Sequence, residues 1–269
     1  MSLPPPAAGS TALVTGASSG IGAAIARELA GRGYAVTLVA RREERLRELA
    51  AELADGHGVR ADAIAADIGS RTGRDELARA IGSLGLEVEV LVNNAGFGGA
   101  GNFAEFDRGR QVEMVALNCE ALLDLQARYL APMIGRGKGA VINIASTASF
   151  QPMPGTAAYA ATKAFVLSLS EGVHSELQGT GVTLTVVCPG PVRTEFTEAA
   201  GIAGAEERLP GFFWLDAETV AREALDGVAR GKRVIVPGAL NRAGALTGQH
   251  TPRALSLPVV KHAWRRGAL

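Results

Sequence analysis

The sequence has little of what marks a secreted, membrane-spanning or metal-binding protein. Only two of its 269 residues are cysteines. Cys119 and Cys188 each stand in an apolar context, so we expect small core residues rather than a disulfide framework. No apolar run reaches the roughly 18 residues that a transmembrane helix needs. The four histidines are scattered, at positions 57, 174, 250 and 262, and we expect no metal site.

The N-terminal segment, residues 1–9, has neither a basic start nor a long apolar centre, so it is unlike a signal peptide. We expect a disordered leader and a cytoplasmic protein. The formal net charge is zero, and we expect no nucleic-acid partner.

The charges are unevenly distributed along the chain. After Asp226 there are eight basic residues and no acidic one, and apolar residues lie among them in the C-terminal extension, residues 238–269. Such a segment can form a peripheral contact with anionic lipid or with a partner. Alternatively, it packs on its own subunit or on another one. We favour the second interpretation.

Hydrophobic residues make up 47% of the chain, and apolar strand-like runs alternate with helical stretches between residues 10 and 237. Runs at 11–15, 35–40, 61–65, 88–92 and 182–188 are the expected strands. This alternation predicts an α/β protein with a single-domain, doubly wound Rossmann-type fold, in which helices cover both faces of a parallel sheet.

The first expected strand leads directly into a glycine-rich turn and then into a helix. The glycines are Gly16, Gly20 and Gly22, spaced differently from the G-x-G-x-x-G fingerprint. Glycines allow the backbone to approach a pyrophosphate closely, and a helix N-terminus offers free N–H groups to the anion. The segment therefore indicates a dinucleotide site, although a glycine turn without a ligand would have the same pattern.

Two arginines, Arg41 and Arg42, follow the second expected strand, where an acidic residue would bind the ribose 2′-hydroxyl of NAD. A guanidinium group suits a phosphate instead, because its planar fork can donate two hydrogen bonds. The position favours NADP(H), unless both arginines are ordinary solvated charges at a helix start.

Tyr159 and Lys163 lie four residues apart, which places them on one face if the segment is helical. A neighbouring cation favours the phenolate, and the hydroxyl of Ser146 could hold a substrate oxygen against the tyrosine. The three residues together could move a proton to or from an alcohol or carbonyl oxygen. An amphipathic helix with a half-buried tyrosine would give the same spacing.

With these motifs, residues 10–237 resemble the short-chain dehydrogenase/reductase family, in the branch that has Tyr-x-x-x-Lys. Further motifs match in order along the chain: Asp67-Ile68, Asn93-Asn94-Ala95-Gly96, Asn118, Pro189-Gly190 and Thr194. The resemblance implies hydride transfer between a nicotinamide and a carbonyl or alcohol carbon.

The resemblance also implies a role for each catalytic residue. Tyr159 would be the general acid or base, and Lys163 would lower its pKa and hold the nicotinamide ribose. Ser146 would donate to the substrate oxygen, and Asn118 would hold a water that connects Lys163 to solvent. The expected cofactor-binding residues are Gly16, Ser18, Ser19, Gly20, Ile21, Gly22, Arg41, Arg42, Asp67, Ile68, Asn94, Ala95, Gly96, Tyr159, Lys163, Pro189, Gly190, Val192 and Thr194.

One residue departs from the pattern of some NADP-using relatives, which carry a basic residue just before the second glycine of the turn. That residue is Ser19 in this chain. Phosphate selectivity would then depend on Arg41, with or without Arg42, and NAD(H) stays open as an alternative cofactor.

A substrate lid is expected at about residues 190–215. Its apolar residues, and others expected at the same cleft, favour an apolar or bulky carbonyl or alcohol substrate, unless they form the core of the lid itself. The residues are Phe97, Phe150, Met153, Phe196, Ile202, Leu209, Phe212, Phe213 and Trp214.

These inferences predict an NADP(H)-dependent, ketoreductase-like oxidoreductase. The alternative is a catalytically silent dinucleotide-binding module that acts through a partner. The resemblance further implies a homodimer or homotetramer, in which the helices that contain Asn118 and Tyr159 pair across a two-fold axis.

Overall fold

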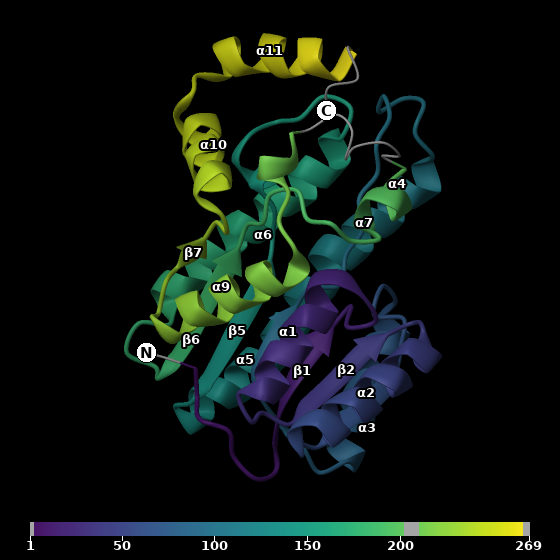
Figure 1. Cartoon of the computed structure of the whole chain (residues 1–269), viewed down its shortest axis with the longest axis vertical. Coiled ribbons are helices and arrows are strands. Elements are labelled where there is room, and N and C mark those ends of the chain that lie inside the picture. Colours follow the sequence, from purple (N-terminus) through teal and green to yellow (C-terminus); the bar gives the residue numbers. More distant parts are fainter. Residues whose placement is uncertain (1–2, 202–209, 266–269) are drawn as a thin grey trace.

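A parallel sheet of seven strands runs through the centre of the molecule (Figure 1). The computed structural model describes residues 3–201 and 210–265. The strand order is β3-β2-β1-β4-β5-β6-β7. The strands are β1 (Ser10–Thr15), β2 (Val36–Ala40), β3 (Ala61–Ala65), β4 (Glu87–Asn93), β5 (Gly139–Ile144), β6 (Val182–Val187) and β7 (Val234–Ile235). The predicted fold class is confirmed.

Helices cover both faces of this sheet because the side chains of each strand alternate between the faces. Ala12 and Val14 of β1 point into one core, and Leu13 points into the other. The first core is closed by α1 (Gly20–Gly31), α2 (Glu43–His57) and α9 (Ala217–Ala229). The second is closed by α3 (Arg71–Ser83), α5 (Leu122–Arg136) and α6 (Ala157–Glu176).

The remaining described elements lie mainly beyond the carboxyl ends of the strands (Figure 1). They are α4 (Arg108–Val115), the π-helix η1 (Ala116–Ala121), the 3-10 helix η2 (Thr147–Phe150), α7 (Phe196–Ala199), the 3-10 helix η3 (Gly211–Phe213), α10 (Ala239–His250) and α11 (Arg253–Arg265). Two of the expected lid residues, Ile202 and Leu209, lie outside the described residues.

A network of buried amides joins the middle of the sheet to two helices. Asn93 of β4 donates to Asn143 of β5 at 2.9 Å. The Nδ2 atom of Asn143 donates to Gln126 of α5 at 2.7 Å and to the Ser170 hydroxyl of α6 at 2.9 Å. These four side chains are at most 4% exposed. The Oδ1 atom of Asn93 has no hydrogen-bond partner among the described residues, and the other amide contacts of this network join the strands to the helices.

Within the segment 1–9, for which we expected disorder, Leu3 and Pro4 lie against the first core, while residues 5–9 are exposed. Pro4 is buried, and its carbonyl accepts a hydrogen bond of 2.6 Å from the Tyr34 hydroxyl. Leu3 packs against the same core. In the described part of the chain, none of the helices combines the length and the apolar character that a membrane span requires.

Candidate active site

Most of the expected site residues meet because they follow the carboxyl ends of strands, while Asn118 lies in η1 and Tyr159 and Lys163 lie in α6. Between β1 and β4 the strand order reverses, and in open parallel sheets ligands bind in the crevice at such a point. The glycine turn follows β1, the two arginines follow β2, and Asp67 follows β3. The turn that begins at Asn94, Ser146 and Pro189 then follow β4, β5 and β6.

The glycine turn needs its glycines for conformation and for space. Gly16 and Gly20 have φ of 67° and 56°, in the left-handed region. A Cβ at Gly22 would collide with the carbonyl oxygen of Gly16. The Nδ2 atom of Asn94 donates to the carbonyls of Thr15 and Gly16 at 3.0 and 3.2 Å. Since α1 begins at Gly20, the turn leads into a helix N-terminus, the kind of backbone site that binds anions.

The turn after β4 lies directly against the glycine turn. The Thr15 hydroxyl accepts hydrogen bonds from the backbone N–H groups of Asn94 and Ala95, at 3.0 and 3.1 Å. A Cβ at Gly96 would lie 2.7 Å from Asn118 Oδ1 and 3.6 Å from Lys163 Nζ. Gly96 is therefore required where the cofactor side of the crevice meets the catalytic side.

The two arginines after β2 have different surroundings. Arg42 stands before the first residue of α2 and donates to the hydroxyl groups of Ser18 and Ser19, with distances of 2.7–3.1 Å. It also forms an ion pair of 2.7 Å with Glu195 of the lid. Arg41 is exposed, and among the described residues it has no hydrogen-bond or ion-pair partner.

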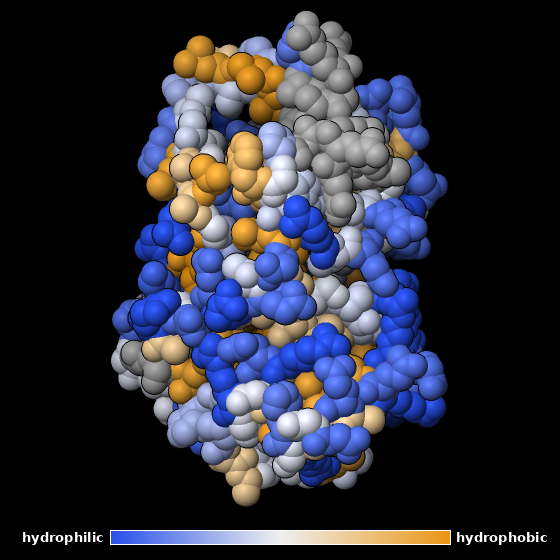
Figure 2. Space-filling model, in the orientation of Figure 1, coloured by the Kyte–Doolittle hydropathy of each residue, from blue (hydrophilic) through white to orange (hydrophobic). Residues whose placement is uncertain are grey.

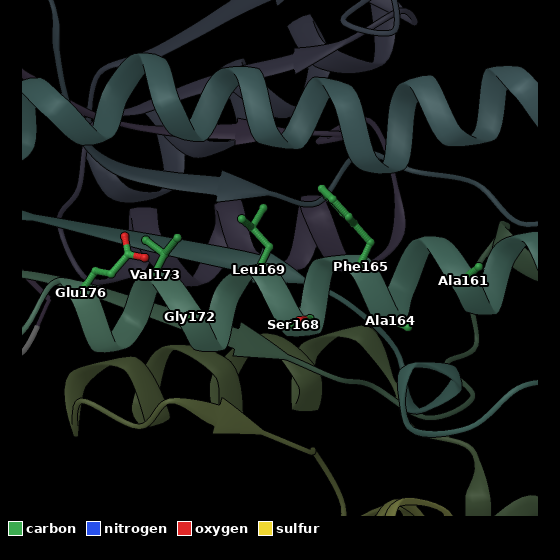
Figure 3. Close-up of a pocket in the computed structure, with 8 residues that line it drawn as sticks. All are labelled: Ala161, Ala164, Phe165, Ser168, Leu169, Gly172, Val173 and Glu176. Atoms are coloured by element: carbon green, nitrogen blue, oxygen red, sulfur yellow. The ribbon is translucent and has the colours of Figure 1, made fainter. Parts of the chain in front are cut away.

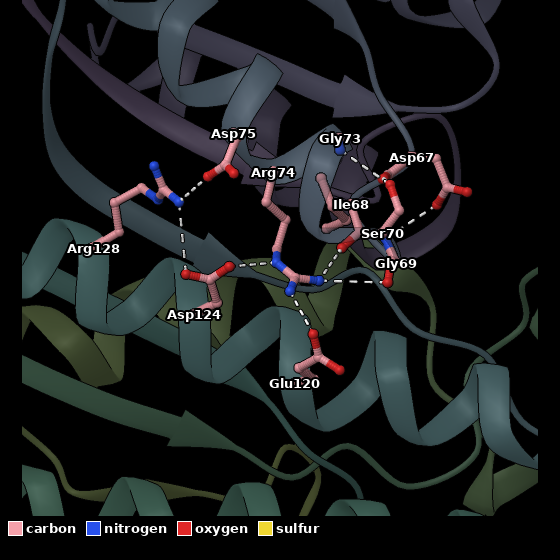
Figure 4. A network of polar contacts seen from close by, with 10 residues as sticks. All are labelled: Asp67, Ile68, Gly69, Ser70, Gly73, Arg74, Asp75, Glu120, Asp124 and Arg128. Carbon is pink, nitrogen blue, oxygen red and sulfur yellow. Dashed lines mark hydrogen bonds and ion pairs between the residues drawn. The ribbon is translucent and has the colours of Figure 1, made fainter.

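The loop after β3, where the adenine is expected, is held by a buried arginine (Figure 4). Arg74 of α3 is 2% exposed and donates to the carbonyls of Ile68 and Gly69 at 3.1 and 3.4 Å. Its guanidinium group also forms ion pairs with Glu120 of η1 and Asp124 of α5. Arg74 thus ties the loop to the helical stretch that carries Asn118.

Four catalytic candidates converge at the other end of the crevice. Lys163 is 5% exposed, and its Nζ donates to the Ile144 carbonyl at 2.9 Å and lies 5.8 Å from the Tyr159 ring centroid. Asn118 lies in the π-helix, a distortion that often occurs at functional sites. Its amide binds the backbone of Phe97 in both directions, at 3.0 and 3.1 Å, and donates to Thr162 at 3.0 Å.

Comparisons with known proteins agree with this geometry. A family model described as short chain dehydrogenase matches residues 10–203. The chain belongs to the short-chain dehydrogenase family. It is 35% identical over 229 residues to the very-long-chain 3-oxoacyl-CoA reductase of Anas platyrhynchos. The aligned region covers 83% of this chain and 70% of that protein.

Two solved structures of similar shape contain nicotinamide cofactors. A short-chain dehydrogenase from Sphingobium yanoikuyae in complex with NADPH is 36% identical, with a TM-score of 0.79 over 89% of this chain and 92% of that chain. A short-chain dehydrogenase/reductase from Burkholderia phymatum in complex with NAD is 25% identical, with a TM-score of 0.79 over 88% and 92%. This short-chain dehydrogenase is accordingly an oxidoreductase of CH–OH and C=O groups with a nicotinamide cofactor.

Burial dominates the ionisation of the catalytic pair. It raises the pKa of Tyr159 to about 12, and a hydrogen bond from the Ser146 side chain opposes the rise. It lowers the pKa of Lys163 to about 8. The lowering of the tyrosine pKa by Lys163 stays a prediction; in this structure its ammonium group donates to the Ile144 carbonyl.

The apolar residues expected in the lid or at its cleft have three kinds of surroundings. Phe196 faces the site, since its ring centroid lies 5.6 Å from that of Tyr159. Trp214 and Phe150 are buried, which makes them core residues, while Phe212 is 64% exposed. Among the described residues of the expected lid, Phe196 is thus an apolar side chain that lies beside Tyr159.

The lid begins close to the glycine turn. Thr194 lies against Gly20, where a Cβ would be 3.1 Å from its Cγ2 atom. Val192 pairs with Leu215 in an isolated parallel bridge, and the Pro189 carbonyl accepts from Thr147 at 2.8 Å. Gly190 packs closely on Asn241 of α10.

Sequence reasoning missed Arg45, Arg74 and Glu195. Arg45 and Glu195 form an ion pair of 2.6 Å across 150 positions of the chain, and Arg74 meets its acidic partners across about 50. No local spacing links such residues, because their approach depends on the path by which the chain returns to the sheet.

Proposed function

We propose that this protein is an NADP(H)-dependent reductase of apolar or bulky ketones, working reversibly on the corresponding alcohols. The observation that carries the proposal is the joint placement of Tyr159, Ser146 and Lys163 beside the lid residue Phe196. The nicotinamide supplies the hydride when it is bound. The roles below concern the protein's own side chains.

In the direction of reduction, the Tyr159 hydroxyl donates its proton to the substrate oxygen. Its raised pKa keeps the phenol protonated at neutral pH, so a proton is available. Ser146 donates a second hydrogen bond to the same oxygen and orients it. Lys163, held by the Ile144 carbonyl, supplies positive charge beneath the tyrosine ring as negative charge develops there.

NADP(H) is favoured over NAD(H) because the crevice has two guanidinium groups directly after β2. Arg41 is exposed and available to a 2′-phosphate, and Arg42 is already turned toward Ser18 and Ser19 of the glycine turn. The residue that directly follows β2 is Arg41, where an acidic residue would bind a free ribose 2′-hydroxyl.

The test of the catalytic assignment is Tyr159→Phe, measured with NADPH and a panel of ketones, aldehydes and β-keto compounds. We expect turnover to be lost while the Kd of NADPH stays nearly unchanged. The matched control is Tyr129→Phe on α5, whose hydroxyl has no hydrogen-bond partner among the described residues. A Tyr159→Phe protein that kept most of its kcat would disprove the assignment.

The same panel tests the alternative of a silent binding module. Parent protein that binds NADPH but reduces no compound would favour that alternative over the reductase.

We also propose that the protein is a homodimer or homotetramer built on α5 and α6. Support comes from a depression on the outer face of α6 (Figure 3). Phe165 in it is 39% exposed, and Leu123 and Ile134 of α5 are 44% and 41% exposed. The lining residues are Ala161, Ala164, Phe165, Ser168, Leu169, Gly172, Val173 and Glu176.

For the C-terminal extension we propose a structural role on its own subunit, in a cytoplasmic protein. Arg253 donates to the Phe150 carbonyl at 3.1 Å, and the Trp264 ring lies against Gly155. Leu255 and Val259 of α11 are 64% and 68% exposed. An apolar area lies at the top of Figure 2, where Figure 1 places α11. Co-sedimentation with anionic vesicles would contradict this role if full-length protein pelleted and a form ending at Pro237 did not.

A further inference from the structure

Glu195 holds an unusual position at the cofactor end of the crevice. It directly follows Thr194, which lies against Gly20 of the glycine turn. Its two carboxylate oxygens form separate ion pairs, with Arg42 at 2.7 Å and with Arg45 at 2.6 Å. Glu195 thus places a carboxylate between the guanidinium group of Arg42, the N-terminal cap of α2, and that of Arg45 within α2.

The same Arg42 guanidinium group reaches the glycine turn. Its Nη2 atom donates to Ser19 at 2.7 Å and to Ser18 at 2.9 Å, while its Nη1 atom serves Glu195. A 2′-phosphate held by Arg42, beside the free Arg41, would need the Arg42 donors that the carboxylate occupies. The two guanidinium groups hold the pKa of Glu195 at about 2, so the carboxylate is charged at every pH used for cofactor binding.

We propose that Glu195 is a specificity-determining residue that competes with the 2′-phosphate of NADP(H) for Arg42 and Arg45. This inference rests on the proposed NADP(H) dependence. The phosphate and the Glu195 carboxylate would repel each other if both bound the same two arginines. Binding of NADP(H) therefore breaks the ion pairs of Glu195 and frees the start of α7. NAD(H) has no charge there and leaves the Glu195 ion pairs intact.

The competition makes the protein less selective for NADP(H) than its two arginines would allow. Glu195, Arg42 and Arg45 are each 44–49% exposed in their side chains. Exposed ion pairs of this kind are weak, so their removal should tighten NADPH binding by only about two- to fivefold. The gain should shrink at high salt, because exposed charges are screened.

The experiment measures the Kd values of NADPH, NADH, 2′-AMP and 5′-AMP by calorimetric titration. The proteins compared are the parent, Glu195→Gln and Glu198→Gln. Glu198→Gln is the matched control, since it makes the same change three residues further along the lid, on an exposed side chain without an ion pair among the described residues. We expect tighter binding of NADPH and 2′-AMP to Glu195→Gln alone, with NADH and 5′-AMP unchanged.

Each contrary outcome has a distinct meaning. Equal affinities of the parent for NADPH and NADH would overturn the proposed NADP(H) dependence itself. A parent that prefers NADPH, with an unchanged Kd in Glu195→Gln, would overturn only the competition. Weaker binding of both cofactors to Glu195→Gln would also overturn it, because Glu195 would then retain cofactor rather than compete with it.

Discussion

The buried ammonium group of Lys163 should make the stability of the protein depend on pH above neutrality. Burial lowers the pKa of Lys163 from its ordinary 10.5 to about 8. Below about pH 8 the folded and unfolded chains both hold the proton, and the folded state bears the cost of a desolvated charge. Between that pH and about 10.5 the unfolded chain binds more protons, so the free energy of unfolding rises with pH.

The size of this effect follows from the pKa change, at about 1.4 kcal/mol for each pKa unit. The full change corresponds to about 3 kcal/mol. The variant Lys163→Met removes the titrating group. The free energy of unfolding of the variant, minus that of the parent, should therefore fall by about 3 kcal/mol between about pH 7 and about pH 10.5.

Urea unfolding of both proteins at several pH values in this range measures the difference. Titrating groups that do not interact with Lys163 contribute equally in both chains and cancel, whereas Cys119 and Cys188, whose pKa values are raised by burial and lowered by its charge, do not cancel fully. Lys261→Met on α11 is the control, because it removes an exposed ammonium group. A difference between Lys163→Met and parent that stays constant with pH would refute the argument. The variant should also lose turnover, so that this lysine favours activity at the expense of stability.

Three further predictions concern the cofactor, the adenine loop and the assembly. Arg41→Asp should erase or reverse the preference for NADPH over NADH. A charge-assisted phosphate contact contributes about 1.5–3 kcal/mol, so the relative affinity should change by roughly 10- to 150-fold. Fluorescence titration with both cofactors measures this change. Arg74→Met should lower the free energy of unfolding by roughly 1–3 kcal/mol, since buried carbonyls lose their donor, whereas Arg71→Met at an exposed position should change it little. Phe165→Asp should reduce the mass measured by light scattering to that of one 27.7 kDa chain, and a parent that is already monomeric would contradict the proposed interface.

The sequence allowed most of the fold to be predicted, because strand periodicity and glycine turns are local signals. The expected strand at 61–65 coincides with β3, and the expected strand at 11–15 differs from β1 by one residue. The Tyr159–Lys163 spacing predicted one helical face, and both residues lie in α6.

What the sequence could not provide was the long-range electrostatics of the site. The protonation of Tyr159 depends on how deeply the phenol is buried, a property that a four-residue spacing does not contain. The contact between Arg42 and Glu195 likewise depends on where the lid returns over the glycine turn. Side chains that are distant in sequence decide such features, and only the packed structure brings them together.

The amide network in the middle of the sheet has a consequence for when the active site forms during folding. Asn143 can pair with Gln126 and Ser170 only after β5, α5 and α6 have reached their final positions. A collapsed chain with incomplete packing would bury these amides without partners, at a cost of about 1–3 kcal/mol for each unpaired group. α5 adjoins the π-helix that contains Asn118, and α6 contains Lys163. Activity should therefore appear in the same step as native packing, and compact intermediates should be inactive.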